Sequence, residues 1–160
     1  MAKTNRDRIT DGLKIFTEGI APFVEREMSS VNGKDWKNKL TIKSIGDPEK
    51  VNWNDPHTIL LILWDQWNTV FKSTLGHAER SLVSELRNFR NRWAHMENFS
   101  SDDTYRTLDS IARLLSAVSS PEVNEIENQK MKLLRLRFDE QRRAESRKAA
   151  VAVDGTPAAN

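Results

Sequence analysis

The chain has 160 residues, a formal net charge of +2 and no cysteine, which allows one hydrophobic core with appendages and excludes disulfides, thiolate metal sites and cysteine nucleophiles. The N-terminus has no apolar signal segment, and the apolar run ILLILW at residues 59–64 is far shorter than the roughly 20 residues that span a bilayer. We therefore expect a cytoplasmic protein that makes no contact with a membrane.

Helical periodicity dominates the first part of the chain. Apolar residues recur at three- and four-residue steps from Ile9 to Val24, which predicts an amphipathic helix of four to five turns. Glycine, proline, aspartate and asparagine then predict a long loop over residues 39–55, with room for a short strand or a helical turn.

A strongly apolar helix is predicted after this loop. Asp55 and Pro56 favour its start, because the carboxylate can accept free amide protons and a proline at the first position loses no hydrogen bond. We expect the helix to run through Phe71 and to end at Gly76 in a left-handed cap. Its apolar residues cover more than one face, which indicates a position in the middle of a bundle or in a subunit interface.

Three further helices are predicted in the second half. One covers about residues 77–94, and the next begins at Ser100, which has capping-box spacing to Asp103. Pro121 opens the last helix. No segment shows sustained two-residue alternation, so the predicted fold class is all-α, a four- to five-helix bundle with a long loop after its first helix.

Three regions follow from these elements. We predict a helical bundle over residues 1–120, a basic C-terminal helix over 121–148 that packs on the bundle at its start, and a disordered tail over 149–160. Between Lys130 and Ala149 there are eight Lys or Arg residues against three Asp or Glu. Such an arm suits an acidic partner such as nucleic acid, although a solvated helix explains it equally well.

Arg90 and His95 are the candidate site residues of the segment RNFRNRWAHMENFSS at 87–101. A guanidinium matches the geometry of a phosphate, and an imidazole suits proton transfer near neutral pH. Five residues correspond to about 500° of helix rotation, so the two side chains diverge by roughly 140°. They converge only if the helix loosens before His95 or if a second copy of the chain supplies one of them. Ordinary capping of a helix C-terminus explains the same residues without chemistry.

The motif RNRWAH resembles the Arg-x(4–6)-His signature of the HEPN superfamily of helical ribonucleases and nucleotide-binding proteins. The run from Trp64 to Leu115 and the basic last helix are similar to the Swt-type branch, and the likeness covers about residues 8–145. It implies an up-down four-helix bundle that commonly dimerises, with the Arg and His residues of both subunits facing one cleft. Active members cut RNA without metal, through attack of the 2′-hydroxyl, and leave a 2′,3′-cyclic phosphate.

The resemblance also implies roles for individual residues. Arg90 would stabilise charge on the phosphoryl oxygens, His95 would move the proton, and Asn91 would orient the scissile group. Arg87 and Arg92 are candidate RNA-binding residues that would contact flanking phosphates. We expect no cofactor and no metal, since the three histidines fall in different segments without ligand spacing.

The functional hypothesis is a homodimeric, metal-independent endoribonuclease that acts on RNA in antiviral or stress defence. The alternative is a non-catalytic RNA-binding, docking or dimerisation module that is a part or partner of a defence ATPase or helicase. The chain itself has no GxxxxGK[ST] phosphate loop. A toxin held by a cognate inhibitor is a third hypothesis.

Overall fold

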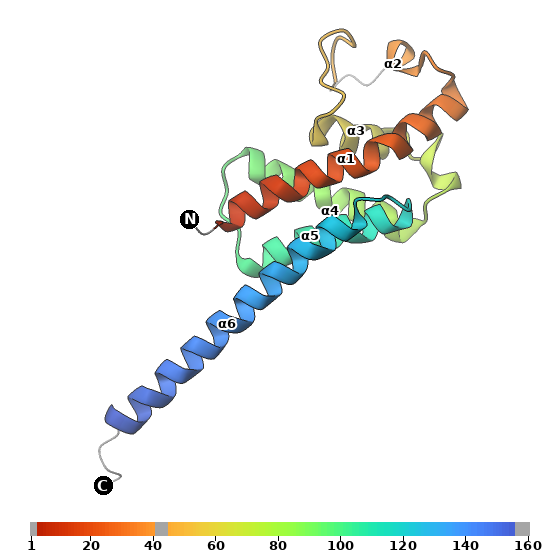
Figure 1. Ribbon diagram of the computed structural model, residues 1–160. Helices are drawn as coiled ribbons and strands as arrows, with labels where there is room; N and C mark the ends of the chain where they lie inside the picture. Colours follow the sequence, from red (N-terminus) through yellow and green to blue (C-terminus); the bar gives the residue numbers. More distant parts are fainter. Residues whose placement is uncertain (1–2, 41–44, 156–160) are drawn as a thin grey trace.

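The computed structural model describes residues 3–40 and 45–155, except for the side chains of 153–155 (Figure 1). Within these ranges it contains helices and no strands, which confirms the all-α prediction. The helices are α1 (Asn5–Asn32), α2 (Trp36–Lys39), α3 (Pro56–Asp65), the short 3-10 helix η1 (Phe71–Ser73), α4 (His77–Ala94), α5 (Ser101–Ala117) and α6 (Val123–Gly155).

Helix α5 is the centre of the fold and packs against α1, α4 and α6. Two glycines on α1 allow the closest of these contacts. A Cβ atom at Gly12 would lie 2.7 Å from Cδ2 of Leu108, and one at Gly19 would lie 2.9 Å from Cδ2 of Leu115. Such distances are shorter than packed carbon atoms tolerate, so α1 and α5 approach this closely because both positions lack a side chain.

Helix α3 packs against both α1 and α4, and its central residues, Ile59 through Leu63, are buried, as an apolar helix inside a bundle requires. It ends at Asp65, so the predicted continuation through Phe71 is wrong. Residues 68–70, Asn-Thr-Val, are poor helix formers, and the turn that replaces the helix brings Val70 and Phe71 into the core.

Gly76 is the N-cap of α4 and not a left-handed cap of α3. Its φ and ψ are −99° and −175°, and its amide donates to the carboxylate of Glu79 at 2.9 Å. The sequence places a helix end and a helix start so close together that a glycine between them fits both interpretations.

Helix α1 is longer than its apolar stripe predicts, because it continues to Asn32 and ends at Gly33, whose φ is +87°. The next residues form the single turn of α2, which buries Trp36 against the bundle. This helical turn precedes the predicted loop of residues 39–55 and overlaps it only at Lys39, while residues 41–44 of that loop lie outside the described part of the chain.

Helix α5 begins as predicted, since the Ser100 hydroxyl accepts from the Asp103 amide at 3.0 Å. The reciprocal half of the predicted capping box does not form. The Asp103 carboxylate accepts instead from Arg92 of α4, which ties the two helices together.

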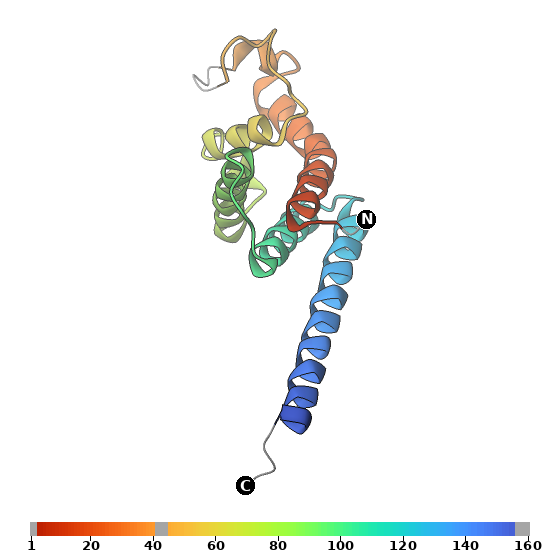
Figure 2. The same ribbon diagram turned by 90° about the vertical axis from the view of Figure 1, so that its left-hand side faces the viewer.

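Helix α6 packs on α5 and α1 through Ile126 and Leu133, and its last recorded ion pair to the bundle joins Arg137 to Asp102. Beyond that point the helix extends alone, as both views show (Figures 1 and 2). It continues to Gly155. The predicted boundary at 148 therefore differs from the structure, because the alanine-rich segment that follows has high helix propensity. Residues 156–160 of the predicted tail lie outside the described residues.

In the ranges that the structure describes, no helix combines the length and the apolar character needed to cross a bilayer.

Candidate functional site

The C-terminal end of α4 is held by the first turns of α1. Trp93 packs on a small hydrophobic cluster, and its indole Nε1 donates to the Thr10 hydroxyl at 2.9 Å. Arg6 donates to the carbonyl of Trp93 at 2.8 Å and stacks over its ring at 5.3 Å. The buried members of the cluster are Ile9, Leu13, Phe89 and Phe99. These contacts fix the position from which the candidate residues project.

A tight backbone reversal ends α4 immediately after His95. Glu97 donates to the Arg92 carbonyl at 3.0 Å and Met96 donates to the Trp93 carbonyl at 3.2 Å. This is the Schellman arrangement, with Met96 in the left-handed conformation at φ 60° where glycine is usual. His95 is the C-cap itself, and its side chain is exposed.

The helix keeps its regular form through Ala94, so it does not loosen before His95. The divergence of about 140° between Arg90 and His95 therefore persists within one chain. Asn91 and His95 are both exposed, and neither side chain makes a recorded hydrogen bond to the described residues. Both remain available for a ligand or for a second copy of the chain.

Arg90 is half-buried and makes no ion pair within the described ranges. Its Nε atom is shielded from solvent and has no hydrogen-bond partner there. An unsatisfied buried donor destabilises a fold by about 1–3 kcal/mol. Arg90 thus carries a donor that no described group of the chain satisfies.

His57 of α3 lies beside this guanidinium. Its pKa is lowered from the ordinary value, mainly by burial and then by the positive charge of Arg90, with a smaller effect from Arg87. The carboxylate of Asp55 opposes this shift. The imidazole is therefore biased toward its neutral form, which can accept or donate a hydrogen bond through its two nitrogens.

Two further arginines extend the same face of α4. The Cζ atoms of Arg80 and Arg87 lie 4.8 and 5.4 Å from the ring centroid of Trp64. Neither of them makes an ion pair with the residues that the structure describes, and Arg80 also has a buried Nε without a partner. We call the face formed by Trp64, Arg80, Arg87, Arg90 and His57 the arginine face.

The sequence analysis missed Arg80 and the positions of His57 and Trp64 in this face. Arg80 and Arg87 are seven residues apart, as are His57 and Trp64, so each pair shares one side of its helix. That matched spacing was the available signal. It could not show that the two pairs face each other, which depends on how α3 packs against α4.

Arg92 differs from its neighbours because its guanidinium is bound within the chain. It donates to Asp103 at 3.0 Å and to the Asn98 carbonyl at 3.1 Å, and it stacks over Phe99 at 4.7 Å. These contacts support a role in joining α4 to α5. Direct contact between Arg92 and RNA stays a prediction.

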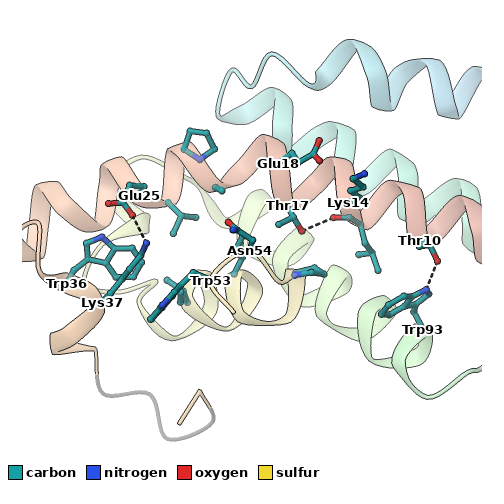
Figure 3. Close-up of a pocket in the computed structure, with 17 residues that line it drawn as sticks. Thr10, Lys14, Thr17, Glu18, Glu25, Trp36, Lys37, Trp53, Asn54 and Trp93 are labelled. Carbon is teal, nitrogen blue, oxygen red and sulfur yellow. Dashed lines mark hydrogen bonds and ion pairs between the residues drawn. The ribbon is translucent and has the colours of Figure 1, made fainter. Parts of the chain in front are cut away.

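A groove of 850 Å³ lies between α1 and α3 (Figure 3). At one end Lys37 pairs with Glu25 at 3.7 Å and lies over the rings of Trp36 and Trp53. At the other end Trp93 is hydrogen-bonded to Thr10. The α3 residues that line the groove, Pro56, Ile59 and Ile62, lie on nearly the opposite side of that helix from His57 and Trp64. The groove is thus separate from the arginine face.

Among the residues that the structure describes, no three or more His, Cys, Asp or Glu side chains lie together in a way that could hold a metal ion.

Comparison with known proteins gives one match. The model of the Swt1-like HEPN family matches residues 11–119, which covers α1 through α5. No curated protein and no solved structure matches the chain. The chain belongs to the Swt1-like HEPN family, and at the level of that family it is a ribonuclease-like or RNA-related helical module.

Proposed function

We propose that this Swt1-like HEPN chain is a metal-independent endoribonuclease whose active site is completed by a second copy of the chain. The observation that carries the proposal is the state of Arg90. Its guanidinium has a buried donor without a partner in the described chain, and it lies on the last turns of the helix that exposes His95. A phosphate would satisfy this guanidinium with charge-assisted hydrogen bonds.

The chemistry requires three actions. The 2′-hydroxyl loses its proton and attacks the adjacent phosphorus, the bond from phosphorus to the 5′-oxygen breaks, and that oxygen takes up a proton. His95 moves the proton, because an imidazole can accept a proton at one ring nitrogen and donate one from the other. Arg90 stabilises the charge on the phosphoryl oxygens, and Asn91 orients the scissile group through its amide. The products are a 2′,3′-cyclic phosphate and a 5′-hydroxyl.

A second copy is needed because of helix geometry. Within one chain Arg90 and His95 point about 140° apart, and α4 is regular between them. A two-fold axis near the end of α4 would place the Arg90 of one copy opposite the His95 of the other, since isologous interfaces exchange the same pair of residues in both directions. HEPN domains typically bind RNA or dimerise, which agrees with this arrangement.

The test is cleavage of a single-stranded RNA in excess chelator, with analysis of the product ends. We expect 2′,3′-cyclic phosphates from the unchanged chain and a loss of at least about 100-fold in rate for His95→Ala, the usual contribution of general acid–base catalysis. His77→Ala is the matched control, because His77 is exposed at the other end of the same helix. Cleavage that survives His95→Ala, or that stops in chelator, would refute the mechanism.

A non-catalytic RNA-binding module is the second candidate. The exposed His95 favours this candidate, because no hydrogen bond to the described residues orients its imidazole. This candidate predicts salt-dependent RNA binding without turnover. A binding titration at two salt concentrations beside the cleavage assay separates the candidates. A role in antiviral or stress defence beside an ATPase or helicase remains a prediction, which the neighbouring genes would check.

A further inference from the structure

We propose that Arg80 and Arg87, held on Trp64, form a second phosphate-binding site that grips single-stranded RNA next to the nucleotide bound at Arg90. This inference rests on the proposed function, because it assigns the substrate path of the same site. It adds Arg80 and Trp64 to the residues that would contact RNA, and it defines the ligand as a strand with regularly spaced phosphates.

Three arginines lie together on one face of α4 without an acidic partner among the described residues. Arginines on the exposed C-terminal part of α6, such as Arg142 and Arg143, also lack an acidic partner among the described residues. On the bundle, however, several arginines are neutralised by acidic side chains, as Arg106 is by Glu85 and Arg113 is by Asp109. In contrast, Arg80, Arg87 and Arg90 make no ion pair to any residue that the structure describes. Three like charges on one helix face repel one another, so the arrangement favours an anionic ligand.

Trp64 explains how two of these arginines remain ordered without an acid. Both guanidinium groups lie close to the same indole ring, at 4.8 and 5.4 Å from its centroid, which places them within about 10 Å of each other, a span that neighbouring phosphates of one strand can bridge. A ring that attracts the cations leaves the N–H donors at the guanidinium edges free for an oxyanion. The Nε of Arg80 is shielded from solvent and has no partner among the described residues, so the outer guanidinium nitrogens of this half-buried side chain are the donors that an oxyanion can reach.

The order of residues along the two helices sets the direction of the path. Trp64 lies at the C-terminal end of α3 and meets Arg80 near the start of α4. His57 lies at the other end of α3 and is influenced by Arg90 near the end of α4. The helices therefore run antiparallel, and the arginine face spans about 15 Å from Arg80 to Arg90, at 1.5 Å per residue.

RNA fits this face better than an acidic peptide does. Arg80 and Arg90, at the two ends of the arginine face, each have a buried Nε–H without a partner among the described residues. A nucleic-acid strand carries a negative charge at every nucleotide, so one strand can place phosphates at both ends of this face. An acidic segment of a protein would need carboxylates at matching intervals. Single-stranded RNA is favoured over a duplex because the proposed 2′-hydroxyl attack requires a flexible backbone at Arg90.

Binding is measured apart from cleavage by using His95→Ala in every protein. The probe is a fluorescent single-stranded oligouridylate, and its affinity is measured over a range of salt concentrations. The double variant Arg80→Gln, Arg87→Gln should bind more weakly and should lower the slope of log affinity against log salt by about 1.4, at 0.7 for each lost phosphate contact. Trp64→Phe, which keeps an aromatic ring, should weaken binding less than the double variant.

The matched control is Arg106→Gln, Arg113→Gln, which removes the same charge from α5. These side chains are ion-paired and mostly exposed, at 70% and 69%. The slope should stay unchanged in this control. An equal fall in both double variants would show that only net charge matters and would overturn the inference. So would an unchanged slope in Arg80→Gln, Arg87→Gln, or binding of an acidic peptide with no binding of RNA.

The outcomes for the two proposals are distinguishable. If the slope falls as expected but the unchanged chain, with His95 intact, forms no cyclic phosphate ends, the phosphate site stands and the nuclease proposal fails. If cleavage occurs and the slope is unchanged, the nuclease proposal stands and the substrate path along Trp64 is wrong.

Discussion

Arg90 and Arg92 are two residues apart on one helix, and the structure predicts opposite consequences when each is replaced by glutamine. Arg92 donates to Asp103 and to the Asn98 carbonyl, and it stacks on Phe99. Arg90 makes no hydrogen bond or ion pair with the described residues and carries a buried Nε without a partner. Arg92→Gln should therefore destabilise the fold, whereas Arg90→Gln should impair only the site.

The magnitude for Arg92→Gln follows from its contacts. Each hydrogen bond contributes about 1 kcal/mol, because the side chain is 24% exposed and its pairing with Asp103 is partly screened. Stacking on aromatic rings adds about 0.5–1 kcal/mol. The expected loss is about 2–3 kcal/mol, or about 4–12 °C in Tm for a chain of this size. Arg90→Gln should leave the free energy of unfolding unchanged or raise it, by up to about 1–3 kcal/mol, because it removes a buried donor that has no partner among the described residues.

The assay is urea unfolding followed by circular dichroism, at equal protein concentration for both variants. An NMR titration of His57 gives an independent readout, because loss of the Arg90 charge should raise the pKa of this histidine toward its ordinary value. Equal destabilisation by the two substitutions, or a pKa of His57 that does not move in Arg90→Gln, would refute the interpretation of Arg90 as an unpaired site residue.

Three other predictions concern the frame of the site. Folding lowers the pKa of His57, so the unfolded chain binds more protons than the folded chain just below the ordinary value of 6.5. The free energy of unfolding should therefore fall as the pH drops through that value. In unfolding measured over a range of pH, His57→Gln should make this fall smaller. Gly19→Ala should lower the free energy of unfolding by about 1–2 kcal/mol in a denaturant titration, since its Cβ would overlap Leu115, and an unchanged value would contradict the close contact of α1 with α5. Met96→Gly should raise Tm by relieving the left-handed φ of 60°, worth about 0.5–1 kcal/mol, and a lower Tm would contradict this account of the helix end.

The sequence predicted the elements that depend on local chemistry. The start of α3 at Asp55 and Pro56 and the cap at Ser100 follow from short-range hydrogen bonding, and both are confirmed. The predicted end of α3 was wrong because tertiary packing turns Phe71 into the core, and the low helix propensity of residues 68–70 is too weak a local signal to decide against a longer helix. Glycine is the usual residue just after a helix C-terminus, but Gly76 is the N-cap of α4.

For the site, spacing could establish that Arg90 and His95 diverge, and the regular end of α4 confirms this expectation for one chain. Spacing could not reveal which arginines are already bound. Arg92 is satisfied by Asp103, eleven residues away on the next helix, whereas Arg80 and Arg90 keep buried unpartnered donors. That distinction depends on packing between helices, and it separates residues that hold the fold from residues that are free to bind a ligand.

The central claim is that Arg90 of one copy works with His95 of another. The most direct test mixes two inactive variants, Arg90→Gln and His95→Gln, in equal amounts after unfolding and refolding them together. Half of the dimers should then be mixed, and each should contain one intact Arg90–His95 pair, so about a quarter of the original cleavage rate should return. Failure to recover activity in verified mixed dimers, while each variant alone remains folded and dimeric, would contradict the composite site.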